Sequence, residues 1–160
     1  MAYPTVAFSI FFVLVLLFMR ATHKAIPKNH AFIMTGLVFY AYIQPWMAVF
    51  LLAYAFATAK TGLYLENNKN RAVVWAFCTT AIGFLALCKY FNWGLSWFQV
   101  DPMWPSWAVP AALSFMTFQS VWAVLQSYRD EVKDVPLDSR MAHICFFPSI
   151  SSGPIVALSQ

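Results

Sequence analysis

Hydroxyl and amide side chains within one apolar stretch are the first residues in this sequence that could do chemistry. Ser114, Thr117 and Ser120 recur every three residues, with Gln119 beside them. On a helix these positions share one face. Within a bilayer such side chains must find partners or face water, so the pattern predicts hydrogen bonds at a packed helix interface or the wall of a polar tunnel. The spacing alone favours the packed interface.

Tyr128 and Arg129 end the same stretch and introduce a positive charge. Arg129 is followed directly by Asp130 and Glu131, so a local ion pair is the simplest expectation. Two alternatives stay open: Arg129 ties this loop to a neighbouring segment, or it contacts a phosphate such as that of coenzyme A. A cation is also favoured near the C-terminus of a helix.

A second polar group follows in a segment that proline and glycine interrupt. Pro148, Gly153 and Pro154 break a short apolar helix, and Ser152 lies among them. Backbone without helical hydrogen bonds is tolerated at membrane depth only where it is buried in protein or lines a water-filled cavity. The segment is therefore predicted to form a cavity-lining turn, with a position at the membrane interface as the alternative.

Other reactive side chains do not form a recognisable catalytic group. His143 lies in an apolar segment, where an ionisable residue suggests function, but no carboxylate lies within a turn of it to orient it as a base. We assign no catalytic residue in this chain, no metal site and no bound cofactor. The three cysteines have no C-x-x-C spacing and are expected to be small buried hydrophobic residues.

Composition places the chain in a bilayer. It is 61% hydrophobic and 10% charged, whereas about a quarter of the residues of a soluble domain are charged. Lysine, arginine, aspartate and glutamate are absent from five stretches: Met1–Met19, Ala31–Ala59, Ala72–Cys88, Pro102–Tyr128 and Met141–Gln160. The basic residues flank these stretches instead of forming a patch, which argues against nucleic-acid binding. We predict an all-α polytopic membrane protein.

The loops between the apolar stretches predict the topology. Pro4–Met19 is expected to be a retained anchor with the N-terminus outside, because basic residues follow it. Ala31–Ala59 is interrupted by Gln44 and Pro45, so it is one kinked helix or a re-entrant hairpin of two short helices. Basic loops on both sides of this stretch favour the hairpin, since both then lie in the cytoplasm.

The remaining apolar stretches complete a single membrane domain over residues 1–160. Ala72–Cys88 then crosses outward, Asn92–Pro105 forms a tryptophan-rich outside loop, and Ser106–Ser127 returns. The residues Asp130–Arg140 are expected to form a cytoplasmic polar loop. The predicted fold has three spanning helices, a proline-broken re-entrant hairpin and a final short broken helix.

Four phrases of the sequence carry a family resemblance: Val38–Trp46, Leu87–Trp93, Leu113–Gln119 with Tyr128-Arg129, and Phe146–Pro154. In this order they resemble the membrane-bound O-acyltransferase family, in its bacterial branch of alginate O-acetylases and D-alanyl-transfer proteins. Ala111-Ala112 and Gln126-Ser127 depart from the pairs usual in that family, which leaves the subfamily open. The residues of the resemblance that we single out as tunnel or motif candidates are Ser114, Thr117, Gln119, Tyr128, Arg129, Pro148, Ser152, Gly153 and Pro154.

The resemblance implies the N-terminal portion of an acyltransferase in the bacterial inner membrane. Such an enzyme moves an acyl group, here acetyl, from a cytoplasmic thioester (acetyl-CoA or an acyl carrier) to a hydroxyl of an extracytoplasmic polysaccharide. The donor is a substrate, and an extracytoplasmic acyltransferase is an expected protein partner. The family's intramembrane histidine lies in a later region that no residue here matches. The alternatives are a non-catalytic membrane subunit of a polysaccharide modification or export complex and, less favoured, a small transporter.

Overall fold

The computed structural model describes residues 6–22, 27–43, 45–97 and 113–146 of the chain. These residues form six helices and no strand: α1 (Val6–Thr22), α2 (Lys28–Ile43), α3 (Pro45–Asn67), α4 (Arg71–Trp97), α5 (Leu113–Tyr128) and α6 (Leu137–Cys145). Two of the six are long and apolar enough to cross a membrane, α3 over its whole length and α4 over Arg71–Phe91. The predicted all-helical class is confirmed for the described residues, but three spanning helices are not shown.

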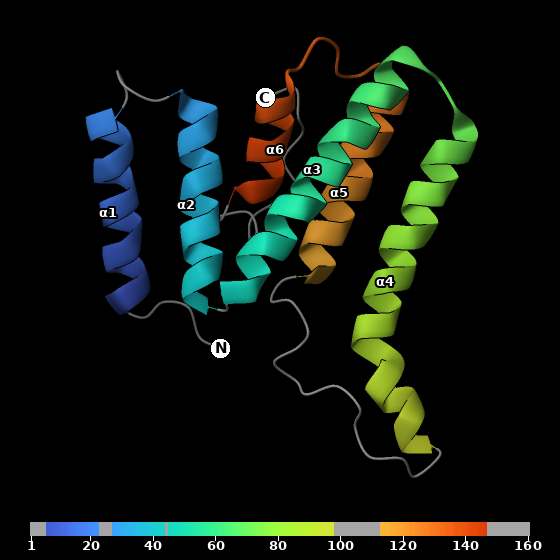
Figure 1. Ribbon diagram of the computed structural model, residues 1–160, viewed down its shortest axis with the longest axis horizontal. Coiled ribbons are helices and arrows are strands. Elements are labelled where there is room, and N and C mark those ends of the chain that lie inside the picture. Colours follow the sequence, from blue (N-terminus) through green and yellow to red (C-terminus); the bar gives the residue numbers. More distant parts are fainter. Residues whose placement is uncertain (1–5, 23–26, 44, 98–112, 147–160) are drawn as a thin grey trace.

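The helices alternate in direction along the chain (Figure 1). Beginning with α1, each helix runs antiparallel to the one before it, so the junctions α1–α2, α3–α4 and α5–α6 lie at one end of the bundle. We call this the charged end, because it includes the basic residues Arg20, Lys28, Lys69, Arg71 and Arg129. The two outer ends of the α2–α3 hairpin therefore lie at the same end, as the distribution of basic residues predicts.

Proline separates α2 from α3 at the predicted place. α2 ends at Ile43 and α3 begins at Pro45, where the missing N–H of proline removes no helical hydrogen bond. The extent of α3 differs from the prediction: it continues past Ala59 to Asn67 instead of ending before Lys60. The exposed Lys60 side chain lies with Nζ 5.5 Å from the centroid of the Phe56 ring. A long lysine stem can follow an apolar surface in this way, so the charge does not end the helix.

Two other helix boundaries also differ from the prediction, the end of α4 and the start of α6. α4 continues past Lys89 to Trp97, so the first part of the predicted outside loop is helical. The ring centroids of Trp93 and Trp97 lie 4.9 Å apart on this helical end. At the other end of the bundle, α6 already begins at Leu137, inside the predicted polar loop. Arg140 consequently lies in a helix, with its side chain buried.

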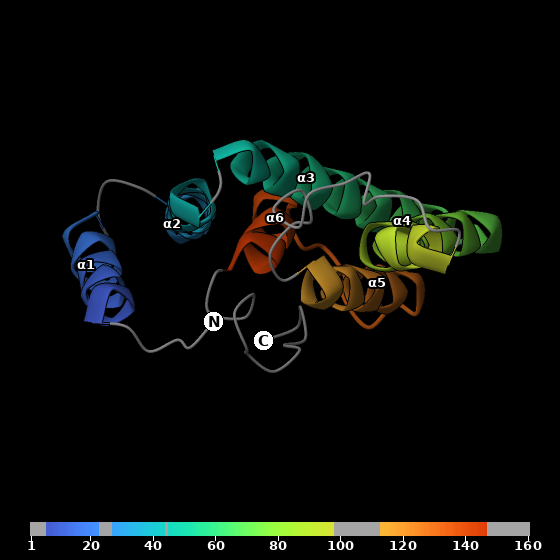
Figure 2. The ribbon, with the colours of Figure 1, turned by 90° about the horizontal axis from the view of Figure 1, so that it is seen from below.

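The short helix α6 lies at the centre of the bundle, among α2, α3 and α5 (Figure 2). α1 packs against α2 at one edge, and α4 packs against α3 and α5 at the other. The main core joins α2, α3, α5 and α6 through the buried side chains of Tyr40, Leu51, Met116 and Ile144, among others. A smaller core of Leu65, Val74 and Val124 holds α4 against α3 and α5.

α2 and α6 approach so closely that only glycine fits between them. A Cβ atom added at Gly36 would overlap the carbonyl oxygen of Cys145, the last residue of α6. Because that oxygen belongs to the backbone, a larger side chain at Gly36 would have to move a helix. The inner end of α6 is therefore fixed against α2.

Candidate functional site

The polar stripe of α5 faces the packed interior of the bundle. Thr117, Gln119, Ser120 and Ser127 are all buried. The Thr117 hydroxyl donates to the Leu113 carbonyl, a bond within the helix that satisfies a hydroxyl in an apolar setting. These side chains thus lie where α5 meets α3 and α6, and the half-buried Ser114 continues the stripe towards the start of α5.

Ser120 and Gln119 each connect α5 to another helix. The Ser120 hydroxyl lies 2.7 Å from the Tyr54 hydroxyl of α3, and Gln119 Nε2 donates to the His143 carbonyl of α6 at 2.9 Å. Hydrogen bonds of this kind hold helices together at a packed interface. They give α5 fixed polar contacts on two sides.

An arginine and a glutamate meet at the charged end of the interface. Arg140 Nη2 lies 2.5 Å from Glu66 Oε2, Nη1 donates to the Ser127 hydroxyl at 2.6 Å, and Nε donates to the Val135 carbonyl at 2.9 Å. The other oxygen of Glu66 accepts from the backbone N–H of Asp134 at 2.5 Å. This group of residues, which we call the Arg140 cluster, joins α3, α5, α6 and the loop before α6.

Burial determines the electrostatics of the Arg140 cluster. The Arg140 side chain is only 3% exposed and that of Glu66 13% exposed. Burial lowers the pKa of Arg140 and the negative charge of Glu66 raises it in part. An arginine nonetheless stays protonated in proteins, so the cluster contains a desolvated ion pair. Such a pair is tolerated when additional hydrogen bonds satisfy the remaining polar atoms, as the bonds to Ser127, Val135 and Asp134 do here.

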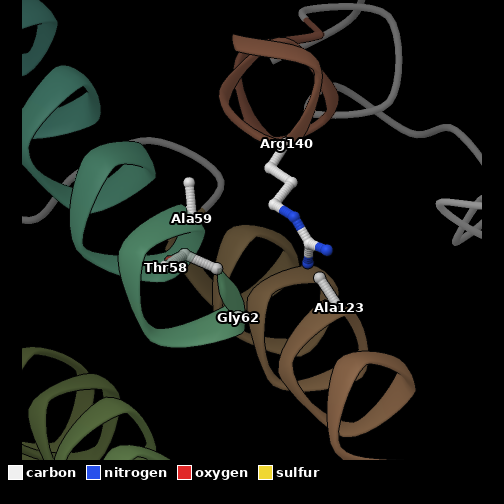
Figure 3. A pocket seen from close by; sticks show the side chains of 5 residues that line it. All are labelled: Thr58, Ala59, Gly62, Ala123 and Arg140. Carbon is white, nitrogen blue, oxygen red and sulfur yellow. The ribbon is translucent and has the colours of Figure 1, made fainter. Parts of the chain in front are cut away.

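A glycine makes room for the Arg140 side chain, which points from α6 into the space between α3 and α5 (Figure 3). A Cβ atom at Gly62 would lie 2.9 Å from Arg140 Nη1 and 3.1 Å from Ser127 Oγ. The small cavity beside the guanidinium is lined by Thr58, Ala59, Gly62, Ala123 and Arg140, and its volume is about 10 Å³. That space admits one water molecule and nothing larger.

A lysine at the same end caps α5. Lys69 Nζ donates to the carbonyls of Ser127 and Tyr128, each at 3.0 Å, and lies 2.7 Å from Asp130 Oδ1. The last carbonyls of a helix lack partners within it, and a cation placed there satisfies them. The hydrogen bond from Lys69 and its charge hold the pKa of Asp130 below its ordinary value. The end of α5 is therefore connected to the α3–α4 turn.

Tyr128 and Arg129, the two motif residues at the end of α5, differ in their burial. Tyr128 is half-buried against the smaller core, whereas Arg129 is exposed, with its Nη1 3.8 Å from Glu131 Oε1. The local ion pair expected for Arg129 is present. The tie between the loop and a neighbouring segment, considered for Arg129, is made by Arg140 instead.

Sequence reasoning missed Arg140, Glu66, Lys69 and Gly62. One signal was available for Glu66, which is the only carboxylate side chain in the first hundred residues and lies at the end of an apolar stretch. A single acid among many bases is a natural partner for one of them. The other four residues singled out, Pro148, Ser152, Gly153 and Pro154, lie outside the described residues.

Further along the same interface, two polar atoms have no hydrogen-bond partner among the described residues. They are Gln119 Oε1 and His143 Nε2, and both are buried. Gln119 lies about two turns before Ser127 on α5, roughly 12 Å along that helix, and His143 lies about one turn after Arg140 on α6. Among the described residues there is no group of three or more histidine, cysteine, aspartate or glutamate side chains that could hold a metal ion.

Comparison with known proteins assigns no relative to this chain. No family model matches it, no curated protein matches it, and no solved structure matches it. The geometry of the described residues therefore carries the functional argument, together with the sequence motifs.

Proposed function

We propose that this chain is a membrane-embedded helical module in which the Arg140 cluster fixes the cytoplasmic end of a polar interface. The lengths of α3 and α4, 23 and 27 residues, correspond to about 34 and 40 Å of helix, against a hydrocarbon core of about 30 Å. Apolar side chains on the outer surface of α4 support a lipid-facing position: Trp75 is 63% and Leu87 56% exposed.

Charge supports an orientation for the module. Among the described residues, every arginine and lysine except Lys89 belongs to the charged end or to the helix turns next to it. By the positive-inside rule this end faces the cytoplasm, which places the start of α1 and the end of α4 on the opposite side. The orientation agrees with a donor that arrives from the cytoplasm and an acceptor that lies outside.

The proposed activity is that of an O-acyltransferase to which this chain contributes the N-terminal membrane portion. Acetyl would pass from a cytoplasmic thioester to a hydroxyl of an extracytoplasmic polysaccharide in the inner membrane of a bacterium. The observation that carries the proposal is the position of α5, which contains the motif residues Leu113–Gln119 and Tyr128 and is followed directly by Arg129. It contacts α3, α4 and α6, and three of its polar side chains are bonded across helix interfaces.

The role of the chain within that activity is structural. The bonded side chains of α5 form one fixed wall, and the histidine that the family uses for acyl transfer has no match here. An extracytoplasmic acyltransferase is proposed as a partner protein. The alternative role is a non-catalytic subunit of a polysaccharide modification or export complex, which the same fixed, hydrogen-bonded interface also suits.

The two roles differ in what they change in the exported polysaccharide. Cells that carry Arg140→Met in place of the wild-type chain should export a normal amount of polysaccharide with at least tenfold fewer O-acetyl esters per sugar. The measurement is ester content by NMR, with Arg129→Met as the matched control, which should leave it unchanged. A smaller amount of polymer with an unchanged ester content per sugar would favour the export subunit and contradict the acyltransferase.

Purified chain gives a second test of the same role. Reconstituted alone with labelled acetyl-CoA and an unmodified polysaccharide, it should transfer no acetyl, because the chain contributes the wall and not the catalytic group. Measurable turnover by the chain alone would refute the division of labour proposed here.

A further inference from the structure

Lys60 is a charged residue within α3, one of the two helices long and apolar enough to cross a membrane. The middle residue of α3 is Phe56, and Lys60 lies one turn after it, about 10 Å of helix before the end at Asn67. Lys60 is the only lysine, arginine, aspartate or glutamate in α3 before Glu66. Its charge therefore lies within the apolar part of a helix that can cross a membrane.

The Lys60 side chain points towards the middle of α3. Its Nζ lies 5.5 Å from the centroid of the Phe56 ring, and that ring belongs to the turn further from the charged end. Lys89 on α4 makes the same kind of contact at the same distance, but with Tyr90, next to the end of the apolar span at Phe91. A lysine near the end of a span reaches the lipid headgroups with its long side chain. The Lys60 ammonium is directed away from them.

In the part of the chain that the structure describes, the Lys60 ammonium has no acidic partner. The ion pairs found there lie at the charged end and involve the basic residues Lys69, Arg129, Lys133 and Arg140. A charged residue within a membrane span is costly and almost always pairs with an opposite charge or with backbone carbonyls. The Phe56 ring offsets part of that cost. A carboxylate is the group that Lys60 lacks.

Lys60 lies on a continuous exposed side of α3, which we call the open face. Positions three, four and seven residues apart share one side of a helix. The open face consists of Val49, Leu52, Ala53, Phe56, Lys60 and Tyr64, all of them exposed. It is apolar apart from Lys60 and the Tyr64 hydroxyl, and the small side chain at Ala53 allows a second helix to approach closely.

We propose that the open face of α3 binds a membrane-spanning helix of a partner protein that carries an aspartate or glutamate at the depth of Lys60. Charge complementarity selects this partner, because its carboxylate pairs with the ammonium while apolar side chains pack around the pair. A second copy of this chain docked through the same face would bring two lysines together. Lipid phosphates lie at the headgroup level, and the Lys60 side chain points the other way. The inference rests on the membrane position of α3 in the proposed function and not on acyl transfer.

The test uses the full chain in lipid nanodiscs, with a donor fluorophore at its N-terminus. The probe is a 23-residue leucine–alanine helix with one glutamate at its centre and an acceptor fluorophore, kept at a low ratio to lipid so that it does not pair with itself. The control probe has glutamine in place of the glutamate. Energy transfer should show that the glutamate helix binds at least tenfold more tightly than the glutamine helix.

Variants then assign the binding to Lys60. Lys60→Met should bind the glutamate helix as weakly as the wild type binds the glutamine helix. Lys89→Met is the matched control, since Lys89 is also an exposed lysine beside an aromatic ring, and it should bind as the wild type does. Lys60→Glu should reverse the preference and bind a helix with a central lysine. This reversal keeps a charge at position 60, so it carries the test if Lys60→Met changes how α3 inserts.

Three results would overturn the proposal. The first is equal binding of the glutamate and glutamine helices by the wild type, and the second is an equal loss in Lys60→Met and Lys89→Met. The third is a ¹⁵N–³¹P dipolar contact between the Lys60 ammonium and lipid phosphate, which would make a headgroup its partner. None of these measurements involves acyl transfer. Their failure would remove the docking surface and leave the O-acyltransferase standing, whereas unchanged O-acetyl esters in Arg140→Met would do the reverse.

Discussion

The Arg140 cluster and the side chains of Gln119 and His143 lie at the same helix interface, but their polar atoms differ in how completely they are hydrogen-bonded. In the cluster, Arg140 is buried and Glu66 is largely shielded from solvent, and each has charged or hydrogen-bonding partners. Further from the charged end, Gln119 and His143 leave one atom each unpaired in the described structure. Polar side chains inside this bundle are therefore fully bonded where they hold α6 in place and incompletely bonded further along the interface.

The energetics of the two places differ accordingly. A buried ion pair adds little net stability compared with apolar residues of the same size, but removing one partner leaves an uncompensated buried charge. The unpaired Nε2 of His143 already costs stability, so His143→Phe should relieve a penalty. An apolar residue at position 119 would also remove the hydrogen bond to the His143 carbonyl. Arg140→Met and His143→Phe should therefore have opposite consequences for stability.

The largest expected effect is that of Arg140→Met. It leaves the Glu66 carboxylate without its charged partner and removes the bonds to Ser127 and Val135, so the free energy of unfolding should fall by about 3–5 kcal/mol. Reversible unfolding in mixed micelles would measure it. Arg129→Met, whose guanidinium is exposed and 3.8 Å from its partner, should change stability by less than about 0.5 kcal/mol. Equal losses in the two variants would contradict the structural role of Arg140.

The next effect concerns the inner end of α6. Gly36→Ala places a methyl group where the Cys145 carbonyl lies, so α2 and α6 must separate, at a cost of about 1–3 kcal/mol. At Gly83 on α4, an added Cβ meets nothing within 4 Å, so Gly83→Ala should stabilise by about 0.5–1 kcal/mol through helix propensity. Thermal unfolding followed by circular dichroism separates the two, and a stabilised Gly36→Ala would show that the close approach is wrong.

A smaller effect is expected at the cap of α5. Lys69→Met removes the ammonium group from two terminal carbonyls and from Asp130, which should cost about 1 kcal/mol. The loss should appear as faster amide exchange over the last turn of α5. Lys133, 3.8 Å from Asp130 and 65% exposed, provides the matched control, and its replacement by methionine should leave the exchange rates as they are.

The smallest effect is a pH dependence at the same place. The pKa of Asp130 is lowered chiefly by the hydrogen bond from Lys69. Since the folded value lies below the unfolded one, the stabilisation is fully present above the ordinary aspartate pKa of 3.8 and is lost as the pH falls through the lowered value. A carboxyl ¹³C titration should show the pKa of Asp130 rising in Lys69→Met. An unchanged midpoint would mean that Lys69 is not its main partner.

Much of the helical framework follows from local sequence. Pro45 predicts the break between α2 and α3, because proline fits the first turn of a helix and not its interior. The three-residue spacing of Ser114, Thr117 and Ser120 predicts a polar face on α5. The sequence predicts too short an α3, because the charge of Lys60 ends the apolar stretch, whereas the long side chain of Lys60 remains exposed beside Phe56 and the helix continues.

Local sequence does not predict which of the two arginines near the end of α5 is buried. Arg129 and Arg140 both border apolar segments, and the path of the chain between them determines which one is buried. That path includes left-handed backbone at Asp130 and Asp134, with φ of 61° and 56°, a conformation that asparagine and aspartate adopt more readily than most residues but that their presence does not dictate. Glu66 and Gly62, which contact Arg140, lie on α3, more than seventy residues earlier in the chain. The periodicity of the sequence does not encode such a contact.

The proposed arrangement is tested most directly by measuring on which side of the membrane the charged end lies. Topology reporters fused after Lys28 and after Asn68 sample the two outer ends of the α2–α3 hairpin, which lie together in the bundle (Figure 1). If the charged end faces the cytoplasm, both fusions should report the cytoplasm. Reporters on opposite sides would contradict this orientation, since α2 and α3 could then not form the hairpin that holds α6 and the Arg140 cluster.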